Sequence, residues 1–447
     1  MTKDMTRGNP LSLILLFSLP VLLGNLFQQF YNMADTVIVG HFLGEDALAA
    51  VGSTGSIVFL VLGFAIGISQ GFGIMISHAF GAKDIPLLRH YAALSILLGA
   101  VISVIMTVIT MFLSRSLLIF LKTPANILDT ANSFLLIIYG GITATMFFNI
   151  ASSILRGLGN SKVPLYILIL SSVLNVILDF FFIGLLQTGA TGAAWATVIS
   201  QGVSAVLCFL YMFKRFDFFH FHKEDFRPDP SSVKHLLSIG LPTALNYSIT
   251  ASGMMILQSA INFFGSAAVA AYTASSKVEL LAFQPMVSLG TTMATYCGQN
   301  LGAKKYQRIF DGMKQAFIIT FFLTAFAVFI TQGFGSAIVR LFLSHPSDIV
   351  VSYSTQYFNT ISWFFLPLAW IFLYRTALQG LGKGLIPLLG GLLEMGCRFF
   401  VIVFFLKTAG YTAVCFASPA AWVGAGVPLL IVYYVWERKA KKTVSSN

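Results

Sequence analysis

Two carboxylates stand inside long apolar runs of this sequence, where an ionised side chain needs a partner or a function. Asp179 lies deep in the run 163–186, and Asn175 precedes it by one helical turn on the same face. Carboxylate and amide oxygens at this spacing can bind Na⁺ or hold a proton. We therefore expect an ion site at Asp179 and Asn175, with a buried structural hydrogen bond as the alternative.

The other carboxylate, Asp35 in the stretch NMADTVIVGHF, ends a longer apolar run, 11–39. At about 1.5 Å per residue this run exceeds the hydrocarbon thickness of about 30 Å, so Asp35 is expected in the wetter outer half of the membrane. Polar residues precede it on the same helix and are expected to line a central cleft. They are Asn25, Gln28, Gln29 and Asn32.

Four more ionisable residues lie inside apolar runs of the second half: Lys277, Glu279, Glu394 and Arg398. Glu394 and Arg398 are four residues apart on one helix, which favours a pair that neutralises itself over a role in transport. Lys277 and Glu279 are two apart and must point to different faces. Glu279 is a second candidate for a proton or substrate site, with a structural ion pair as the alternative.

The composition decides which solvent these groups meet. With 57% hydrophobic and 10% charged residues and a mean hydropathy of +0.84, the 447 residues have too little polar surface for a water-soluble globule. Twelve apolar runs are long enough to cross a bilayer as helices, the form that satisfies its own backbone hydrogen bonds in lipid. The predicted spans are 11–39, 48–80, 91–113, 133–155, 163–186, 190–213, 236–264, 267–297, 315–339, 353–374, 385–406 and 410–436.

The basic residues predict the orientation of these spans. Most of the 27 Lys and Arg fall in the segments that are cytoplasmic when both termini are cytoplasmic. The net charge of +11 is thus a topology signal, and nucleic acid is not an expected partner. The four cysteines have no paired spacing, and neither a phosphate-binding loop nor a catalytic constellation is present, so we expect no metal centre, no cofactor and no enzyme activity.

The second half of the sequence repeats the first. SLPVLLGN at 18–25 matches GLPTALNY at 240–247, HAFGAKD at 78–84 matches QNLGAKK at 299–305, and ILRGLGNSKVPL matches ALQGLGKGLIPL. The register predicts two six-helix bundles of the same orientation, related by an axis along the membrane normal. The predicted domains are residues 1–213, a cytoplasmic linker at 214–235 and residues 236–447. The linker interleaves Phe and His with charges and is expected to lie along the headgroups, as a tether or as a regulatory segment.

These repeated blocks resemble the multidrug and toxic compound extrusion (MATE) family over essentially the whole chain. Acidic residues in the first and fifth helices, and none in the seventh, are more similar to its DinF-like bacterial branch. The resemblance implies an all-α, V-shaped transporter of twelve helices in the plasma membrane. It also implies export of cationic or amphiphilic compounds in exchange for H⁺ or Na⁺.

The resemblance also implies roles for individual residues. Asp35 matches the first-helix carboxylate of the branch, Asp179 and Asn175 match its fifth-helix pair, and Thr197 matches a sixth-helix hydroxyl that joins them. These residues would hold the coupling ion, and Asp35, Asp179 and Asn175 would be metal ligands only if that ion is Na⁺. Pro20 removes a helix hydrogen bond and permits a bend in the first helix, with a static kink as the alternative.

Two other functions compete with the antiporter. The first is a flippase for lipid-linked precursors, as in the wider superfamily, although fourteen spans and a more cationic cavity would be expected for it. The second is a channel or receptor, which the two-fold repeat disfavours. The expected partners are small lipophilic or cationic substrates and membrane lipids, and a monomer would complete the architecture.

Overall fold

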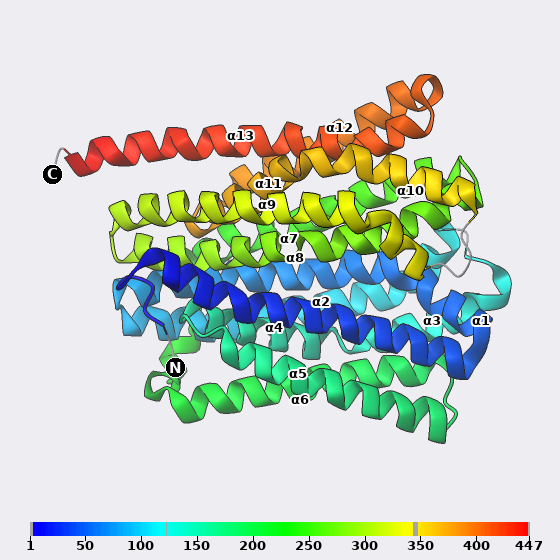
Figure 1. Ribbon diagram of the computed structural model, residues 1–447. Helices are drawn as coiled ribbons and strands as arrows, with labels where there is room; N and C mark the ends of the chain where they lie inside the picture. Colours follow the sequence, from blue (N-terminus) through cyan, green and yellow to red (C-terminus); the bar gives the residue numbers. More distant parts are fainter. Residues whose placement is uncertain (1–2, 122, 343–346, 446–447) are drawn as a thin grey trace. The chain divides into compact units, whose positions relative to one another are not determined.

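The computed structural model describes residues 3–121, 123–342 and 347–445, and within these ranges the chain is built of helices joined by short turns (Figure 1). The segments are strongly apolar, and in lipid a helix is the form in which a single segment satisfies all of its own backbone hydrogen bonds. The helices of the first half are α1 (Pro10–Ala82), α2 (Ile85–Phe120), α3 (Ala125–Gly140), α4 (Ile142–Gly157), α5 (Lys162–Asp179), η1 (Phe180–Leu185) and α6 (Ala190–Arg215). The linker has two short turns, η2 (Asp217–Phe219) and η3 (Lys223–Phe226). The second half has α7 (Pro230–Asn262), α8 (Ser266–Gly302), α9 (Tyr306–Phe342), α10 (Asp348–Ile361), η4 (Ser362–Phe364), α11 (Phe365–Gly380), α12 (Leu385–Ala409) and α13 (Tyr411–Ser445).

The first two predicted spans form one continuous element with a break. Helix α1 has 73 residues, far more than one crossing requires, and its backbone is non-helical at Gly44 (φ 79°, ψ −171°). Glycine adopts this left-handed conformation without steric cost, so the chain turns there. Pro20 lies inside the helical part, and the backbone stays helical through it. The break in α1 is therefore at Gly44.

All twelve predicted spans fall on helices. Among the described residues, eight helical stretches are long and apolar enough to cross a membrane, and the pair α3 and α4, bent by 46°, makes up to nine. Helix α1 holds two predicted spans in one stretch. Helices α7 and α8, with 33 and 37 residues, are long enough to cross a membrane, but they contain no stretch as apolar as those eight. The chain is an all-α, multi-pass membrane protein.

By packing, the chain divides into two compact units whose limits differ from the predicted domains. The first unit contains residues Met1–Asp4 and Leu23–Ser248, and the second contains Met5–Leu22 and Ile249–Asn447. The difference arises because the start of α1 and the start of α7 each pack with the other half of the sequence. Phe17 and Ile14 belong to the hydrophobic core of the second unit, and Leu236 and Ala244 to a core of the first.

In the first unit, glycines on α1 make room for the start of α7. A Cβ added to Gly67 would lie 2.6 Å from the Ala244 Cα, and one added to Gly71 would lie 2.4 Å from the Gly240 Cα. Small residues four apart allow two helix backbones to approach this closely. The Gln70 side chain adds a hydrogen bond, its Nε2 donating to the Tyr247 hydroxyl at 2.9 Å.

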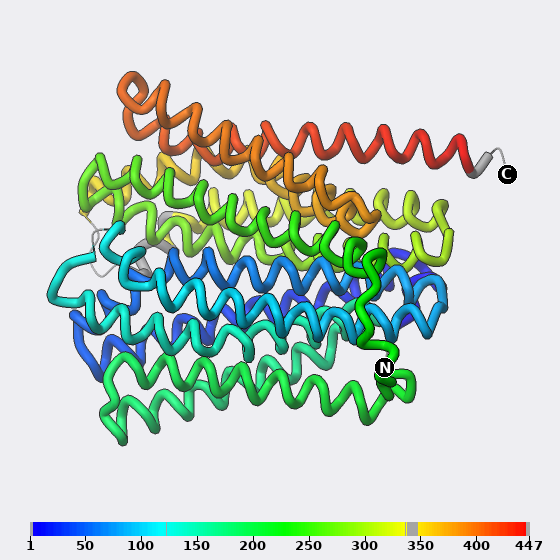
Figure 2. The backbone as a smooth tube through the Cα atoms, turned by 180° about the vertical axis from the view of Figure 1, so that it is seen from behind, coloured from blue at the N-terminus to red at the C-terminus, as the bar shows by residue number. Residues whose placement is uncertain are grey.

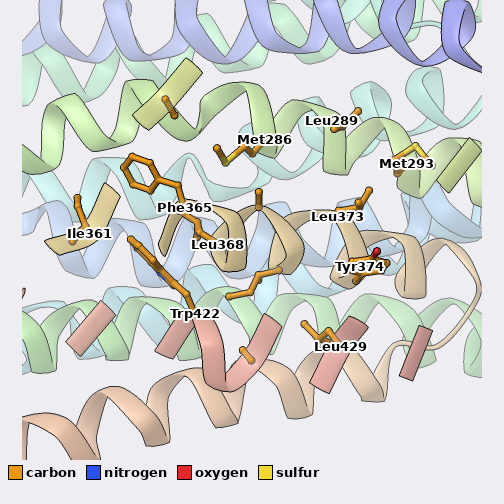
Figure 3. Close-up of a cluster of buried hydrophobic side chains, with 14 of the residues drawn as sticks. Met286, Leu289, Met293, Ile361, Phe365, Leu368, Leu373, Tyr374, Trp422 and Leu429 are labelled. Atoms are coloured by element: carbon orange, nitrogen blue, oxygen red, sulfur yellow. The ribbon is translucent and has the colours of Figure 1, made fainter. Parts of the chain in front are cut away.

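The second unit has one large hydrophobic core (Figure 3). Met286, Leu289 and Met293 of α8 face residues of α10 and α11, and Trp422 of α13 packs on Phe365 with ring centroids 6.2 Å apart. The N-terminal segment joins this unit through hydrogen bonds: Met5 is fully buried, and its N–H donates to Gln299 Oε1 at 2.9 Å.

The linker between α6 and α7 is folded against the start of α2 (Figure 2). Its phenylalanines pack on one another, and Phe219 is fully buried. Arg89 pairs with Asp225 at 2.8 Å, and His90 Nε2 lies 2.7 Å from Asp229 Oδ1. The linker is thus a docked element of the first unit and more than a loose tether.

Candidate functional site

The two carboxylates predicted from the first half meet inside the first unit. Asp35 on α1 and Asp179, the last residue of α5, have their carboxyl groups next to each other. The Asp179 side chain is fully buried, and Asp35 is half-buried. Residues 144 positions apart in the sequence thus form one site.

Neutral side chains hold the Asp179 carboxyl group in place. With its amide oriented to satisfy both neighbours, the Asn175 carboxamide, 1% exposed, donates to Asp179 Oδ2 at 3.1 Å and accepts from the Thr197 backbone N–H at 3.2 Å. The Thr197 side chain also lies against Tyr31, which is one turn before Asp35 on α1. Thr197, on α6, therefore lies between residues of α5 and α1. Tyr31 was not predicted, although its position four residues before Asp35 puts it on the same helix face.

The helix changes type where Asp179 stands. Helix α5 ends at Asp179, and the π-helical turn η1 begins at the next residue. A π turn is rare and widens the helix locally, so its carbonyl and side-chain positions differ from those of a regular helix.

The closeness of the carboxyl groups constrains their charge. Two adjacent carboxylates repel each other, so a shared proton or a bound cation stabilises the pair. Asp35 Oδ1 and Asp179 Oδ1 are buried, with no hydrogen-bond partner among the described residues. A buried carboxyl oxygen without a partner is costly, which makes these two atoms the natural ligands for a cation.

A cation bound here would need neutral ligands as well. Among the described residues, no group of three or more His, Cys, Asp or Glu side chains is arranged to hold a metal ion. The two carboxylates and the Thr197 hydroxyl form a set of hard oxygen ligands, which suits Na⁺, whereas the Asn175 oxygen already accepts from the Thr197 N–H. The same atoms also suit a proton, so the geometry accommodates both coupling ions.

The residues predicted for the substrate cleft occupy different environments. Gln28 and Asn32 on α1 are exposed, whereas Asn25 and Gln29 are partly buried. Glu279 belongs to the second unit, where it is 9% exposed on α8 and accepts a hydrogen bond of 2.7 Å from the Tyr357 hydroxyl. Lys277 is exposed, so it and Glu279 do point to different faces.

The predicted pair of Glu394 and Arg398 is present, and Glu394 has a second, closer partner. Glu394 Oε2 accepts from Arg375 NH2 on α11 at 2.7 Å, while Arg398 NH2 lies 3.6 Å from Glu394 Oε1. Arg375 lies one residue beyond the predicted span 353–374, and it was therefore not counted as an intramembrane charge. Glu394 thus joins two arginines, and the closer bond links two helices.

A model of the MatE family matches residues 20–181 and again residues 242–404. The chain belongs to the MATE family. Two separate matches to one family model agree with the internal repeat found in the sequence. Because MATE proteins are membrane transporters, the chain is not an enzyme. Its position in the DinF-like branch stays a prediction, since it rests on which helices carry acidic residues.

Relatives within the MATE family cover most of the chain. The probable multidrug resistance protein YpnP of Bacillus subtilis (strain 168) is 30% identical over 367 residues, 81% of this chain and 80% of that protein. The probable multidrug resistance protein NorM of Thermotoga maritima is 27% identical over 376 residues, 83% and 80% of the two chains. A crystal structure of MATE in the bent conformation has the same fold, with a TM-score of 0.90, 24% identity and full coverage of both chains.

Proposed function

We propose that this protein is a secondary antiporter that exports organic cations and amphiphilic drugs in exchange for H⁺ or Na⁺ by alternating access. The observation on which the proposal rests is the contact between Asp35 and Asp179, with a buried, unpartnered oxygen on each. The names of the relatives, which are multidrug resistance proteins, support the substrate class.

Exchange follows from competition for the same charges. With one shared proton, the pair has one negative charge, and a Na⁺ ion or a cationic group can bind only by compensating that charge or by displacing the proton. Loss of the proton leaves two adjacent carboxylates, which repel each other until a cation arrives. A proton or Na⁺ on one side of the membrane and a substrate cation on the other would then bind alternately.

The remaining predicted residues have supporting roles in this proposal. Asn175 and Thr197 orient Asp179, and the polar residues of α1 line the route of the substrate. Glu279, with Tyr357, is a second proton or substrate site in the other unit. Both termini are cytoplasmic, the substrates and the surrounding lipids are the partners, and a monomer performs the transport.

The proposal is tested by efflux of a fluorescent lipophilic cation from cells that produce the protein. We compare the wild type with Asp35→Asn and Asp179→Asn, and collapse the H⁺ and Na⁺ gradients separately. Asp46→Asn is the matched control, because it removes an exposed carboxylate from the same helix α1.

We expect efflux by the wild type and by the control, and we expect it to depend on one of the two gradients. Both site variants, present at the same abundance in the membrane, should show no efflux. Normal efflux by both site variants would contradict the roles of the aspartates. A wild type that moves no cation would contradict the antiporter and favour the lipid-precursor flippase.

A further inference from the structure

The second unit contains a mostly buried group of charged side chains between its helices. Arg375 of α11 and Arg398 of α12 face Glu394, with N···O distances of 2.7 and 3.6 Å. Glu279 of α8 accepts a hydrogen bond of 2.7 Å from the Tyr357 hydroxyl of α10. Arg398 is also close enough to Glu279 to act on it electrostatically. The two acids and two arginines are therefore neutral together when all four are ionised.

Within this group, Arg398 is held loosely in a space that the chain leaves for it. Arg398 is 5% exposed and lies near the middle of α12. Its NH2 is 3.6 Å from Glu394 Oε1, which is too long for a hydrogen bond, and its Nε is buried with no hydrogen-bond partner among the described residues. On α7, a Cβ added to Gly253 would clash with Arg398 NH1. The glycine thus makes room for a cation that is not tied to one partner.

The internal repeat shows what stands at this place in the first unit. Helices α5 and α12 begin 223 residues apart, and the same interval relates Asn175 to Arg398. In the first unit Asn175 donates a hydrogen bond to Asp179. The equivalent of Asp179 in the second unit is Ile402, which has no charge. The second unit thus lacks that carboxylate and has a fixed cation where the first unit has a neutral amide.

The acids of the two units differ in where their counter-charge comes from. In the first unit Asp35 and Asp179 act on each other, and no lysine or arginine in the described part of the chain is among the charges that act on them. A cation for that pair must come from outside. In the second unit the chain supplies the cation, because Arg398 acts on both Glu279 and Glu394.

We propose that Arg398 determines the ion specificity of the second unit: as a built-in cation it excludes Na⁺ from Glu279, so that a proton is the only coupling ion that can bind there. A Na⁺ ion beside the guanidinium is repelled, whereas a proton bonds to the carboxylate and neutralises it. Arg398 is a positioning residue, since it acts through Glu279. The inference rests on the proposed role of Glu279 as an exchange site, but its test measures ion binding and does not depend on export.

The test measures binding of radioactive Na⁺ to the purified full-length protein in neutral detergent, at about pH 8.5, well above the ordinary pKa of a carboxyl group. All samples carry Asp35→Asn and Asp179→Asn, so the first unit does not contribute. To this background we add Arg398→Gln, Arg398→Met as a second variant without the charge, or Arg398→Lys, which keeps the charge. Lys277→Gln is the matched control, because it removes an exposed cation from the helix that carries Glu279.

We expect no saturable Na⁺ binding by the background protein, by Arg398→Lys or by Lys277→Gln. Arg398→Gln and Arg398→Met should each gain about one Na⁺ per protein, because the remaining charges of the group then sum to minus one. Adding Glu279→Gln should abolish that gain.

The proposal is overturned if the background protein binds Na⁺ and Glu279→Gln removes this binding, a result that does not require either Arg398 variant to fold. It is also overturned if Arg398→Gln and Arg398→Met are folded and bind no Na⁺, or if Lys277→Gln gains as much Na⁺ as they do.

Discussion

Asp35 of α1 and Asp179 of α5 bring their carboxyl groups next to each other, where two negative charges would repel. The contact joins two helices, and Oδ1 of each side chain is buried with no hydrogen-bond donor among the described residues. It therefore combines a proton site and a cation site in the same atoms.

Replacing Asn175 by alanine should shift ion binding at this pair. The change removes the N–H that Asp179 Oδ2 accepts and the oxygen that receives the Thr197 N–H. Hydrogen bonds to charged groups contribute about 1.5–3 kcal/mol, and losing this one favours the protonated over the ionised carboxyl group. Half-maximal efflux should therefore move to a pH about 1 to 2 units higher if H⁺ is the coupling ion, and to a roughly 10- to 100-fold higher Na⁺ concentration if Na⁺ is. Asn132→Ala, which removes a neutral hydrogen bond with Ser114 in the same unit, is the control. Equal ion dependence in Asn175→Ala and wild type would contradict this role.

Replacing Glu394 by glutamine should destabilise the second unit. Arg375 and Arg398, both mostly buried, would lose their shared counter-charge. Removing one partner of a buried ion pair costs about 3–5 kcal/mol, whereas an exposed pair contributes at most about 1 kcal/mol. The control is therefore Asp129→Asn, which breaks the exposed pair with Arg115. The apparent Tm should fall clearly only for Glu394→Gln, and equal Tm values for the two variants would refute the prediction.

Replacing Gly71 by alanine should disturb the crossing of α1 and α7. The added Cβ would lie 2.4 Å from the Gly240 Cα, so one backbone must move. Overpacking of this kind typically costs about 1–3 kcal/mol. Gly55→Ala on the same helix meets no atom within 4 Å and should leave the Tm unchanged or raise it slightly. A Gly71→Ala protein as stable as Gly55→Ala would show that the close approach is absent.

The docked linker should depend on pH through Asp229. Hydrogen bonds from the Ser232 backbone N–H and from His90 lower the pKa of Asp229 to about 2. Because the folded pKa lies below the ordinary value of about 3.9, the stabilisation is complete above about pH 4 and is lost as the pH falls toward 2. The Tm difference between wild type and Asp229→Asn should thus be constant from pH 7 to about pH 5 and shrink by pH 3. Asp217→Asn in the same linker is the control, and a difference that grows on acidification would contradict the prediction.

Much of the fold was predictable from hydrophobic run length and from the repeat. The twelve apolar runs all became helices, since lipid leaves the backbone few alternatives. The break at Gly44 falls in the gap between the first two predicted spans, 11–39 and 48–80. The limits of the packing units were missed because they depend on contacts between distant segments, such as Gly71 with Gly240, that periodicity does not report.

The candidate site was predictable in part, for a similar reason. Asp179 and Asn175 stand out because a carboxylate and an amide one turn apart are rare deep in an apolar run. The Asp35–Asp179 contact came from resemblance, since spacing within one helix says nothing about its neighbours. Tyr31 was missed because a tyrosine is ordinary at a membrane helix end. Arg375 was missed because hydropathy places the end of a span only to within a few residues.

The most direct test of the shared site is proton or Na⁺ release from purified protein on addition of a lipophilic cation, in weakly buffered detergent solution. If Asp35 and Asp179 hold the coupling ion, the wild type and Asp46→Asn should release close to one H⁺ or one Na⁺ per bound cation. Asp35→Asn and Asp179→Asn should release neither ion. Release that persists in both site variants, or cation binding by the wild type without any release, would contradict the claim that substrate and coupling ion compete at this pair.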